Sequence, residues 1–317
     1  MVQLVLQEIV PLLALAIAGV VGGRYFDFRK GSEKVLTHFV LWFAGPSALI
    51  LAVQSTSPMA LLDARLSLTS LFVWCVCYFA VLLIHKFVLD RPLSRSAIAA
   101  SCATSMNLIM IGLPITLSVA GDEAGASVAI NALLSLVIFV PITVAFIGES
   151  EPKDHKVTSH ELSDHIFDAV RNPLVIGTLV GLLLLASQIS IPGTIQSVLV
   201  LLKESAVPVG MVALGLTINS LGLNSINVEV CMMSGVKMIL SPAIAFAAAY
   251  CFKLPPASAT SLILLFSCPP ALHAYVLASE NEVYEKEADG IILLSLMISV
   301  ITIPGFIYAC KSIWILP

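Results

Sequence analysis

The chain has 317 residues, of which 58% are hydrophobic and only 11% are charged, and its formal net charge is -4. Soluble domains carry roughly a quarter charged residues, so this composition excludes a soluble globular protein and predicts a polytopic membrane protein. The seven cysteines lack CxxC spacing, so we interpret them as small core residues rather than as a disulfide framework or a metal site. We expect the lipid bilayer to be a partner, and we expect no nucleic acid, cofactor or bound metal.

Ten apolar runs are long enough to be membrane-spanning helices, for which about 20 residues are needed. They cover residues 4–22, 35–54, 66–88, 97–120, 126–147, 173–189, 195–218, 229–252, 257–279 and 288–314. A polar stretch, 148–172, separates the fifth run from the sixth. The sequence therefore predicts an all-α membrane protein with a first five-helix repeat (1–147), a polar loop (148–172) and a second five-helix repeat (173–317).

Basic residues predict the orientation, because Lys and Arg are enriched in cytoplasmic loops. The loops that follow the odd-numbered helices contain Arg24, Arg29, Lys30, Lys34, Lys86, Arg91, Arg95, Lys153, Lys156, Arg171 and Lys286. The loops on the opposite side contain only Arg65, Lys253 and Lys311. We therefore expect both termini outside the cell and the central loop in the cytoplasm.

The two halves share motifs in the same order. Ala44–Pro46 in the second helix recurs as Ala206–Pro208 in the seventh. Leu133–Leu136 in the fifth helix recurs as Leu293–Leu296 in the tenth, and a proline follows each copy. Because each half has five crossings, the second half must enter the membrane from the opposite face. The pattern predicts an inverted repeat with a binding site near mid-membrane, between the halves.

Two of the predicted helices contain residues that disfavour a helix. Ser105–Pro114 places an amide, a glycine and a proline in the fourth helix, and Ser267–Pro270 places two prolines in the ninth. A proline removes a backbone donor and clashes with the preceding turn, so we expect the fourth helix to break or kink at Pro114. Transporters use such breaks for binding, because half-helix ends offer free N–H and C=O groups. The alternative is a pair of proline-kinked packing helices.

A set of short motifs points to one known family. They are Asn107 with Gly112 and Pro114, Arg171–Pro173, Pro208–Gly215, Lys237–Pro242 and Pro269–Ala278. In this order, over nearly the whole chain, they resemble the auxin efflux carrier family, which includes plant PIN-type carriers and bacterial carriers of malonate and malate. The short central loop is similar to that of bacterial members, which implies the bacterial inner membrane.

The resemblance implies the fold of the bile acid:sodium symporter-like superfamily, in which the broken fourth and ninth helices cross. It implies a scaffold made of helices 1, 2, 6 and 7, a mobile transport domain made of helices 3–5 and 8–10, and a homodimer. One residue departs from the family pattern, since many bacterial relatives carry Asn at the position of His273. We therefore do not infer that this chain shares the substrate or coupling ion of those relatives.

Three polar residues are the main candidates for substrate binding, and each has a structural alternative. The Asn107 amide can donate to a carboxylate, or it can bond a backbone carbonyl freed by the break. Lys237 can add positive potential to the site, or it can extend its side chain to the cytoplasmic interface. His273 can carry a coupled proton, or it can be a neutral core histidine.

Further residues complete the predicted site. The substrate-binding candidates also include Gly112, Pro114, Ser267, Pro269, Pro270, Asn131, Ser135 and Pro46. Asn131 and Ser135 lie one helical turn apart, and their alternative is polar packing between helices. Glu8 is a second candidate for proton coupling, and its alternative is a position at the outer interface.

These observations predict a secondary transporter of a small organic anion, a mono- or dicarboxylate or an auxin-like acid, that works by alternating access at the crossing of the fourth and ninth helices. Proton coupling is favoured over sodium coupling, because the interior has few hard oxygen ligands. The alternatives are a sodium-coupled symporter of the bile-acid type and a sensor that binds a metabolite without transporting it. An enzyme is disfavoured, since the chain has no P-loop, nucleophile elbow or dinucleotide fingerprint.

Overall fold

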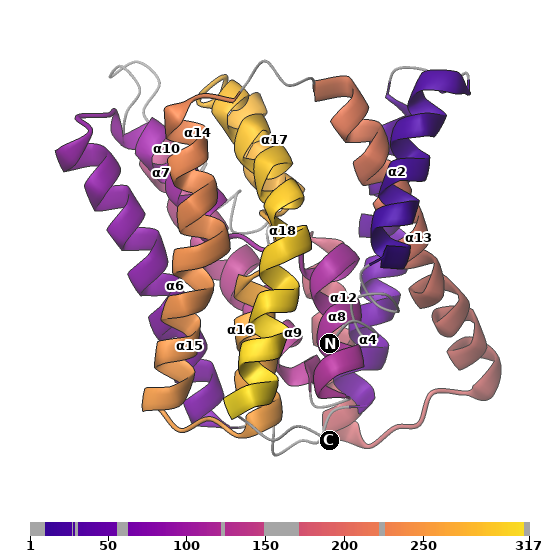
Figure 1. Cartoon of the computed structure of the whole chain (residues 1–317). Helices are drawn as coiled ribbons and strands as arrows, with labels where there is room; N and C mark the ends of the chain where they lie inside the picture. Colours follow the sequence, from indigo (N-terminus) through magenta and orange to yellow (C-terminus); the bar gives the residue numbers. More distant parts are fainter. Residues whose placement is uncertain are drawn as a thin grey trace.

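The computed structural model of the chain describes residues 10–26, 28, 31–55, 63–121, 124–148, 171–221 and 226–313. Within these residues every regular element is a helix, and no β-strand is present. The all-helical class predicted from the sequence is therefore confirmed for the described chain (Figure 1). Glu8 and most of the polar stretch 148–172 lie outside the described residues.

The α-helices follow the order of the predicted apolar runs. Those of the first half are α2 (Val10–Tyr25), α3 (Ser32–Phe39), α4 (Gly45–Ser55), α6 (Ala64–Leu83), α7 (Leu93–Thr104), α8 (Leu113–Ala120), α9 (Ala124–Leu133) and α10 (Val140–Gly148). Those of the second half are α12 (Pro173–Ser187), α13 (Gly193–Leu221), α14 (Val228–Gly235), α15 (Ser241–Cys251), α16 (Pro256–Phe266), α17 (Leu272–Glu280) and α18 (Glu285–Ile313). Some of them are continued by the π-helical segments η2 (Val40–Ala44), η3 (Ile84–Val88), η4 (Leu108–Gly112), η5 (Leu134–Phe139) and η8 (Val236–Leu240).

Seven helices of the described chain are long and apolar enough to cross a membrane. They are Ser32–Ser55, Ala64–Val88, Leu93–Ala120, Ala124–Gly148, Gly193–Thr217, Val228–Cys251 and Glu285–Ile313. Leu93–Ala120 is interrupted at Ser105–Asn107, between α7 and η4. Three shorter apolar helices, Ala14–Tyr25, Pro173–Ser187 and Pro256–Phe266, lie where the first, sixth and ninth crossings are predicted. The total of ten crossings and the inverted repeat remain predictions.

Proline explains most of the π-helical segments. Pro46, Pro114, Pro141 and Pro242 are each the second residue of the α-helix that directly follows such a segment. A proline inside a helix cannot donate its hydrogen bond, and its ring crowds the carbonyl one turn earlier. The wider π turn, which bonds residue i to residue i+5, gives the ring room. The helices therefore continue through these four prolines.

Two close pairs of helices form one part of the molecule, in which α2 packs along α13 and α4 packs along α12. In the first pair, a Cβ atom on Gly215 would lie 2.8 Å from the Gly19 Cα. In the second pair, a Cβ atom on Gly177 would lie 2.7 Å from the Pro46 Cα. Glycine at these positions lets the two backbones approach closely, as at many helix contacts in membranes. We call these four helices, with α3, the paired group.

The remaining helices, α6–α10 and α14–α18, form a second group, which we call the central group (Figure 1). Here α6 packs against α7 and α15, α14 packs against α18, and α16 packs against α15 and α8. The two groups meet where α9 contacts α4 and α12, and where η4 contacts α13. The segment η4 therefore belongs to the central group and touches the paired group.

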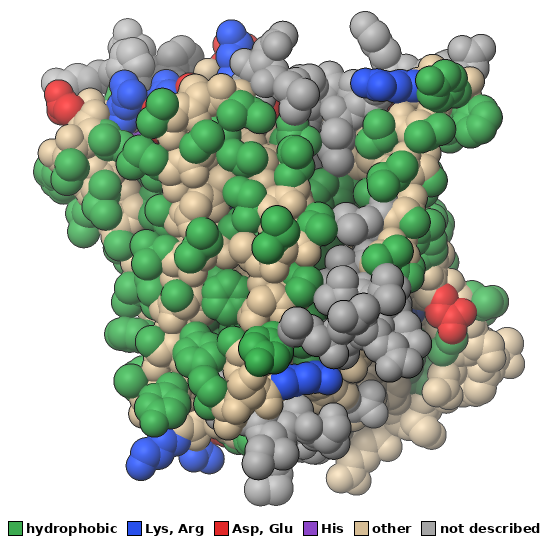
Figure 2. Space-filling model, viewed as in Figure 1, with side chains coloured by type: hydrophobic (Ala, Val, Ile, Leu, Met, Phe, Trp, Pro, Cys, Tyr) green, Lys and Arg blue, Asp and Glu red, His purple; other side chains and the backbone are tan. Residues whose placement is uncertain are grey.

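The outer surface is largely apolar. Phe87, Leu201 and Ile301 are 72%, 68% and 77% exposed. Figure 2 shows hydrophobic side chains over most of one face, with Lys, Arg, Asp and Glu gathered mainly near its upper and lower edges. This distribution is expected when lipid surrounds the middle of the molecule.

Candidate functional site

The first interruption lies at Ser105–Asn107, between α7 and η4. Asn107 begins the second half-helix, because its Oδ1 accepts a hydrogen bond from the Met110 N–H at 3.2 Å. Side-chain oxygens of this kind cap the free N–H groups at the start of a helix. An asparagine cap therefore defines where the helix resumes.

The helix does not break at Pro114, so that part of the prediction is wrong, and a kink there stays a prediction. Pro114 is the second residue of α8, and the helix runs through it from Leu108 to Ala120. The physical reason is the π-helical segment before it, which accommodates a residue without an N–H donor. Pro114 lies within the second half-helix and not in the gap.

The second interruption, Ser267–Ala271, separates α16 from α17. Two buried prolines, Pro269 and Pro270, lie within it. The Ser267 hydroxyl donates to a carbonyl in the last turn of α16 at 2.8 Å, so it closes that helix. Ala271 precedes α17 and provides no side-chain cap. The first N–H groups of α17 therefore have no capping side chain. Because such groups have no partner within their own helix, they can donate to a ligand.

The two interruptions touch each other. The Asn107 N–H donates to the Pro269 carbonyl at 2.9 Å, although these residues are far apart in the sequence. Gly112 permits a close approach, since a Cβ atom there would lie 2.8 Å from Leu265 Cδ2. Asn107 is 8% exposed, and its Nδ2 has no hydrogen-bond partner among the described residues. The meeting point therefore offers a free amide donor beside an uncapped helix start.

Lys237 projects from η8 toward the second interruption and is fully buried. Its Nζ lies 5.8 Å from the centre of the Phe266 ring and has no hydrogen-bond partner in the described part of the chain. The alternative in which this side chain extends to the membrane surface is wrong. A buried charge without a partner is costly, which makes Lys237 a functional candidate.

Asn131 and Ser135 lie in α9 and η5, inside the central group. Trp74 Nε1 donates to Asn131 Oδ1 at 2.9 Å, and Asn131 Nδ2 donates to the Ser127 carbonyl at 2.8 Å. Ser135 is 2% exposed. Polar packing accounts for the contacts of Asn131 in this structure, and substrate binding by either residue stays a prediction.

Pro46 and His273, the two remaining candidates for substrate binding, lie in different parts of the structure. Pro46 lies in α4, where its backbone packs against Gly177 of α12. His273 lies in the first turn of α17, directly after the second interruption, and is partly buried. Among the described residues its ring makes no hydrogen bond. His273 therefore adjoins the meeting point, whereas Pro46 belongs to a helix contact of the paired group.

Sequence similarity to known proteins identifies the family of this chain. A profile of a family described as membrane transport proteins matches residues 4–307. The chain belongs to this family, the auxin efflux carriers. The family resemblance of the sequence motifs is thereby confirmed.

Relatives of this carrier are named as transporters. An Escherichia coli (strain K12) protein named "Uncharacterized transporter YfdV" is 24% identical over 310 residues, which cover 96% of this chain and 98% of that protein. A Rhizobium meliloti (strain 1021) protein named "Putative malonate transporter" is 23% identical over 317 residues, which cover 96% of this chain and 95% of that protein. The chain is thus an integral membrane transporter, and transporters are usually not enzymes.

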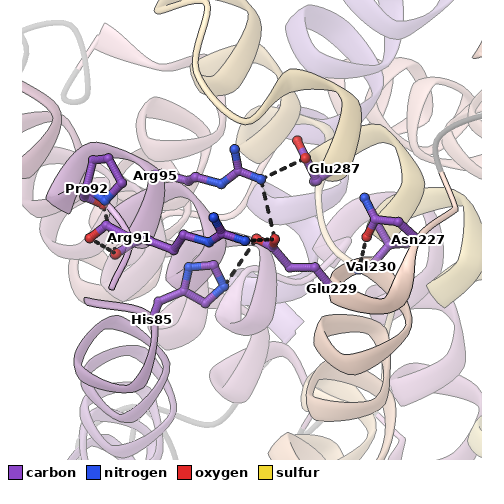
Figure 3. A network of polar contacts seen from close by, with 9 residues as sticks. His85, Arg91, Pro92, Arg95, Asn227, Glu229, Val230 and Glu287 are labelled. Carbon is purple, nitrogen blue, oxygen red and sulfur yellow. Dashed lines mark hydrogen bonds and ion pairs between the residues drawn. The ribbon is translucent and has the colours of Figure 1, made fainter. Parts of the chain in front are cut away.

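Sequence reasoning missed a charged network in the carrier, shown in Figure 3. Arg95 Nη2 lies 2.7 Å from Glu287 Oε1 and 3.4 Å from Glu229 Oε2. Glu229 also lies 3.3 Å from Arg91 Nη2 and 3.5 Å from His85 Nε2. These contacts fasten the starts of α7, α14 and α18 to one another. The only sequence signal was a set of charges near helix ends, which equally fits solvated loops.

The carrier also contains a half-buried acidic group that sequence reasoning did not single out. Asp289, in the second turn of α18, has an enclosed Oδ1 without a hydrogen-bond partner among the described residues. Tyr275 and Ser279 of α17 instead donate to Glu285, at 3.4 and 3.2 Å. Within the described ranges, no group of three or more His, Cys, Asp or Glu side chains is placed to hold a metal ion.

Proposed function

We propose that this transporter carries a small organic anion, a mono- or dicarboxylate or an auxin-like acid, and binds it where the two interrupted helices meet. One observation carries the proposal. The Asn107 N–H bonds the Pro269 carbonyl, so two interruptions that are distant in the sequence form one place in the molecule. Interrupted helices that meet inside a membrane bundle commonly form the binding sites of secondary transporters. In this proposal the fourth and ninth helices cross at that point.

The groups around the meeting point suit a carboxylate. The free Nδ2 of Asn107 is a hydrogen-bond donor, and a carboxylate accepts several such bonds. The uncapped start of α17 carries the partial positive charge of a helix N-terminus, which attracts anions. His273, in the first turn of the same helix, adds a ring that can donate to the solute. A cationic solute would meet the same positive groups and be repelled.

The buried Lys237 supports the choice of an anion. Its Nζ lies close to the second interruption, and its electrostatic neighbours are thiols rather than carboxylates. A negative charge about 10 Å away would be stabilised by about 1–2 kcal/mol at an effective dielectric constant of about 20. The name of the Rhizobium meliloti relative specifies malonate, which supports a dicarboxylate as one candidate solute.

The helix packing supports a division into a scaffold and a transport domain. In the proposal the paired group supplies scaffold helices 1, 2, 6 and 7, and the central group supplies transport-domain helices 3–5 and 8–10. The pair α2–α13 joins helices 1 and 7, and the pair α4–α12 joins helices 2 and 6. Exchanging the two halves of an inverted five-helix repeat turns one pair into the other. This supports ten crossings in two inverted repeats, 1–147 and 173–317.

Transport proceeds, in this proposal, by alternating access. The central group carries both interruptions and moves against the paired group, which exposes the site to each side in turn. The contacts of η4 with α13 and of α9 with α4 and α12 are the surfaces that slide. The proposal includes both termini outside the cell, a cytoplasmic central loop, a homodimer in a bacterial inner membrane, and coupling to protons rather than to sodium.

Uptake by reconstituted vesicles tests the proposed site. Labelled malonate, malate, lactate and indole acetate are offered to vesicles that contain either the wild-type protein or Asn107→Ala. We expect the wild type to take up at least one of these acids. We expect the uptake rate of Asn107→Ala to be lower by roughly tenfold or more, because a hydrogen bond to a charged group contributes about 1.5–3 kcal/mol.

Asn281→Ala is the matched control, because Asn281 is exposed beyond the end of α17 and bonds only its own helix. Its uptake should equal that of the wild type. Equal uptake by Asn107→Ala, at equal amounts of protein, would remove Asn107 from the site. A requirement for a sodium gradient would favour a symporter of the bile-acid type, and saturable binding without flux would favour a sensor.

A further inference from the structure

Lys237 combines full burial with the absence of a partner in the described chain. Ser241, one turn further along the same helix, donates to the Ala103 carbonyl of α7 at 3.1 Å. The helix that carries Lys237 is thus fastened to the end of α7, just before the first interruption. Its Nζ meanwhile lies near Phe266, the last residue of α16 before the second interruption. The ammonium group therefore lies near both interrupted helices that form the proposed site.

Among the described residues, no carboxylate interacts electrostatically with Lys237. The groups that interact with it electrostatically are the thiols of Cys77, on α6, and Cys268, in the second interruption. Cys268 Sγ donates to the Leu264 carbonyl at 3.2 Å, so this thiol is engaged with its own helix. The Phe266 ring and the two thiols carry no negative charge that would offset the ammonium group of Lys237, and within the described chain its Nζ has no hydrogen-bond partner.

The charged groups on the other elements packed against η8 have other neighbours. Glu229 of α14 and Glu287 of α18 both pair with Arg95 of α7. Asp289 of α18 has an Oδ1 without a hydrogen-bond partner among the described residues, but the charged group near it is Glu285, and Lys237 interacts with thiols. The helix α15, which continues η8, contains no Asp, Glu, Lys, Arg or His. Since no described residue supplies a counter-charge for Lys237, a bound anionic solute is well placed to supply it.

An enclosed ammonium group without a counter-charge is unfavourable while the site is empty. Lysine can avoid this cost as the neutral amine, whereas arginine stays charged. An anion at the meeting point supplies the missing negative charge and stabilises the ammonium form. By thermodynamic linkage, a proton on Lys237 must strengthen anion binding by the same factor.

We propose that Lys237 binds the proton that crosses the membrane together with the organic anion, which makes the protein a proton–anion symporter. This inference rests on the proposed anion site. When the site opens to the more acidic side, the neutral amine takes a proton from water and becomes an ammonium. When the site opens to the other side and the anion leaves, the ammonium returns the proton to water. One positive and one negative charge cross together, and neither His273 nor Glu8 has to carry the proton.

The binding test measures protons and anions at once. Malonate and lactate, both ionised at about pH 8, are added to the purified full-length protein in weakly buffered detergent with a pH-indicator dye. We expect the wild type to take up about one proton for each anion bound. Its Kd should then rise by up to about tenfold for each unit of increasing pH.

Lys237→Arg separates the charge from the exchangeable proton. This variant should bind the anion without proton uptake and with a Kd that does not depend on pH, because a guanidinium stays charged. In vesicles it should exchange labelled anion, yet it should lose accumulation driven by a pH gradient. Lys237→Met should lose both proton uptake and most of the affinity. Lys311→Met, a change at an exposed lysine near the end of α18, should behave like the wild type.

Two results would overturn the proton role while leaving the anion site in place. One is anion binding by the wild type without proton uptake, and the other is proton uptake by Lys237→Arg equal to that of the wild type. If Lys237→Arg fails to elute as a folded protein in gel filtration, the wild-type pH dependence and Lys237→Met decide. A wild type that neither binds nor carries any organic acid would instead contradict the proposed function itself.

Discussion

Trp74 shows how polar side chains are satisfied inside the central group of helices. Its ring stacks on Phe139 with the centroids 4.7 Å apart, while its Nε1 donates to Asn131 Oδ1 at 2.9 Å. Tyr78, one turn further along α6, lies with its hydroxyl 2.8 Å from Thr143 Oγ1. The polar groups in these pairs bond each other, whereas the Asn107 amide and the Lys237 ammonium near the two interruptions have donors without a described partner. Several buried serine hydroxyls of the central group also lack a described partner, so the proposed site is marked by its free groups together with their position beside the two interruptions.

Trp74→Phe tests whether the indole bond is structural. The change keeps an aromatic ring next to Phe139 but leaves the buried Asn131 Oδ1 without its donor. We expect a loss of about 1–3 kcal/mol in the free energy of unfolding, the cost of an unsatisfied buried acceptor, measured by thermal denaturation in detergent. Trp42→Phe is the control, since Trp42 is 58% exposed. An unchanged melting temperature for Trp74→Phe would show that the bond contributes nothing.

At the scale of elements, α2 and α13 are held together by direct backbone contact. Gly19 and Gly215 face each other, and a Cβ atom on Gly215 would lie 2.8 Å from both the Gly19 Cα and the Val20 backbone nitrogen. Because these neighbours are backbone atoms, no side-chain rotation can make room. The pair therefore acts as one rigid unit of the proposed scaffold, with glycine required at the crossing.

Gly215→Ala should separate these two helices. Overpacking of a tight contact costs about 1–3 kcal/mol, so the melting temperature of the purified protein should fall by several degrees. Gly305→Ala is the matched control, because a Cβ atom on Gly305, inside α18, would meet nothing within 4 Å. A Gly215→Ala protein as stable as the Gly305→Ala protein would contradict the close contact.

At the scale of the whole molecule, the helices were largely predictable from the sequence. The run 66–88 became the helix Ala64–Val88, and the run 229–252 became Val228–Cys251, because the length of an apolar run and its polar ends fix a crossing. The position of the first interruption was not predictable in this way. The effect of Pro114 depends on the π turn before it, and the cap at Asn107 depends on local geometry.

The site was predictable in its residue types but not in its contacts. Asn107 and Lys237 stand out in the sequence, because polar groups are rare at membrane depth. Their surroundings depend on residues far away in the chain: the Asn107 backbone N–H bonds the Pro269 carbonyl, and no described side chain bonds the Lys237 Nζ. The same holds for Asn131, whose partner Trp74 lies on another helix. Long-range partners of this kind leave no local signal in a sequence.

Motion of the segment after the first interruption against α13 is the central claim of this account. Met110 of η4 faces Gly210 of α13, and a Cβ atom on Gly210 would lie 3.4 Å from the Met110 Cβ. Disulfides join Cβ atoms that are about 3.5–4.5 Å apart, so the double variant Met110→Cys, Gly210→Cys should form a cross-link, which peptide mapping distinguishes from the native cysteines.

Solute uptake by this double variant, before and after reduction, is the most direct measurement. The account predicts that the oxidised protein still binds the organic anion but does not transport it, and that reduction restores uptake. Each single variant should transport equally under both conditions. Undiminished uptake by fully cross-linked protein would contradict the account, because the site would then cross the membrane without moving against α13.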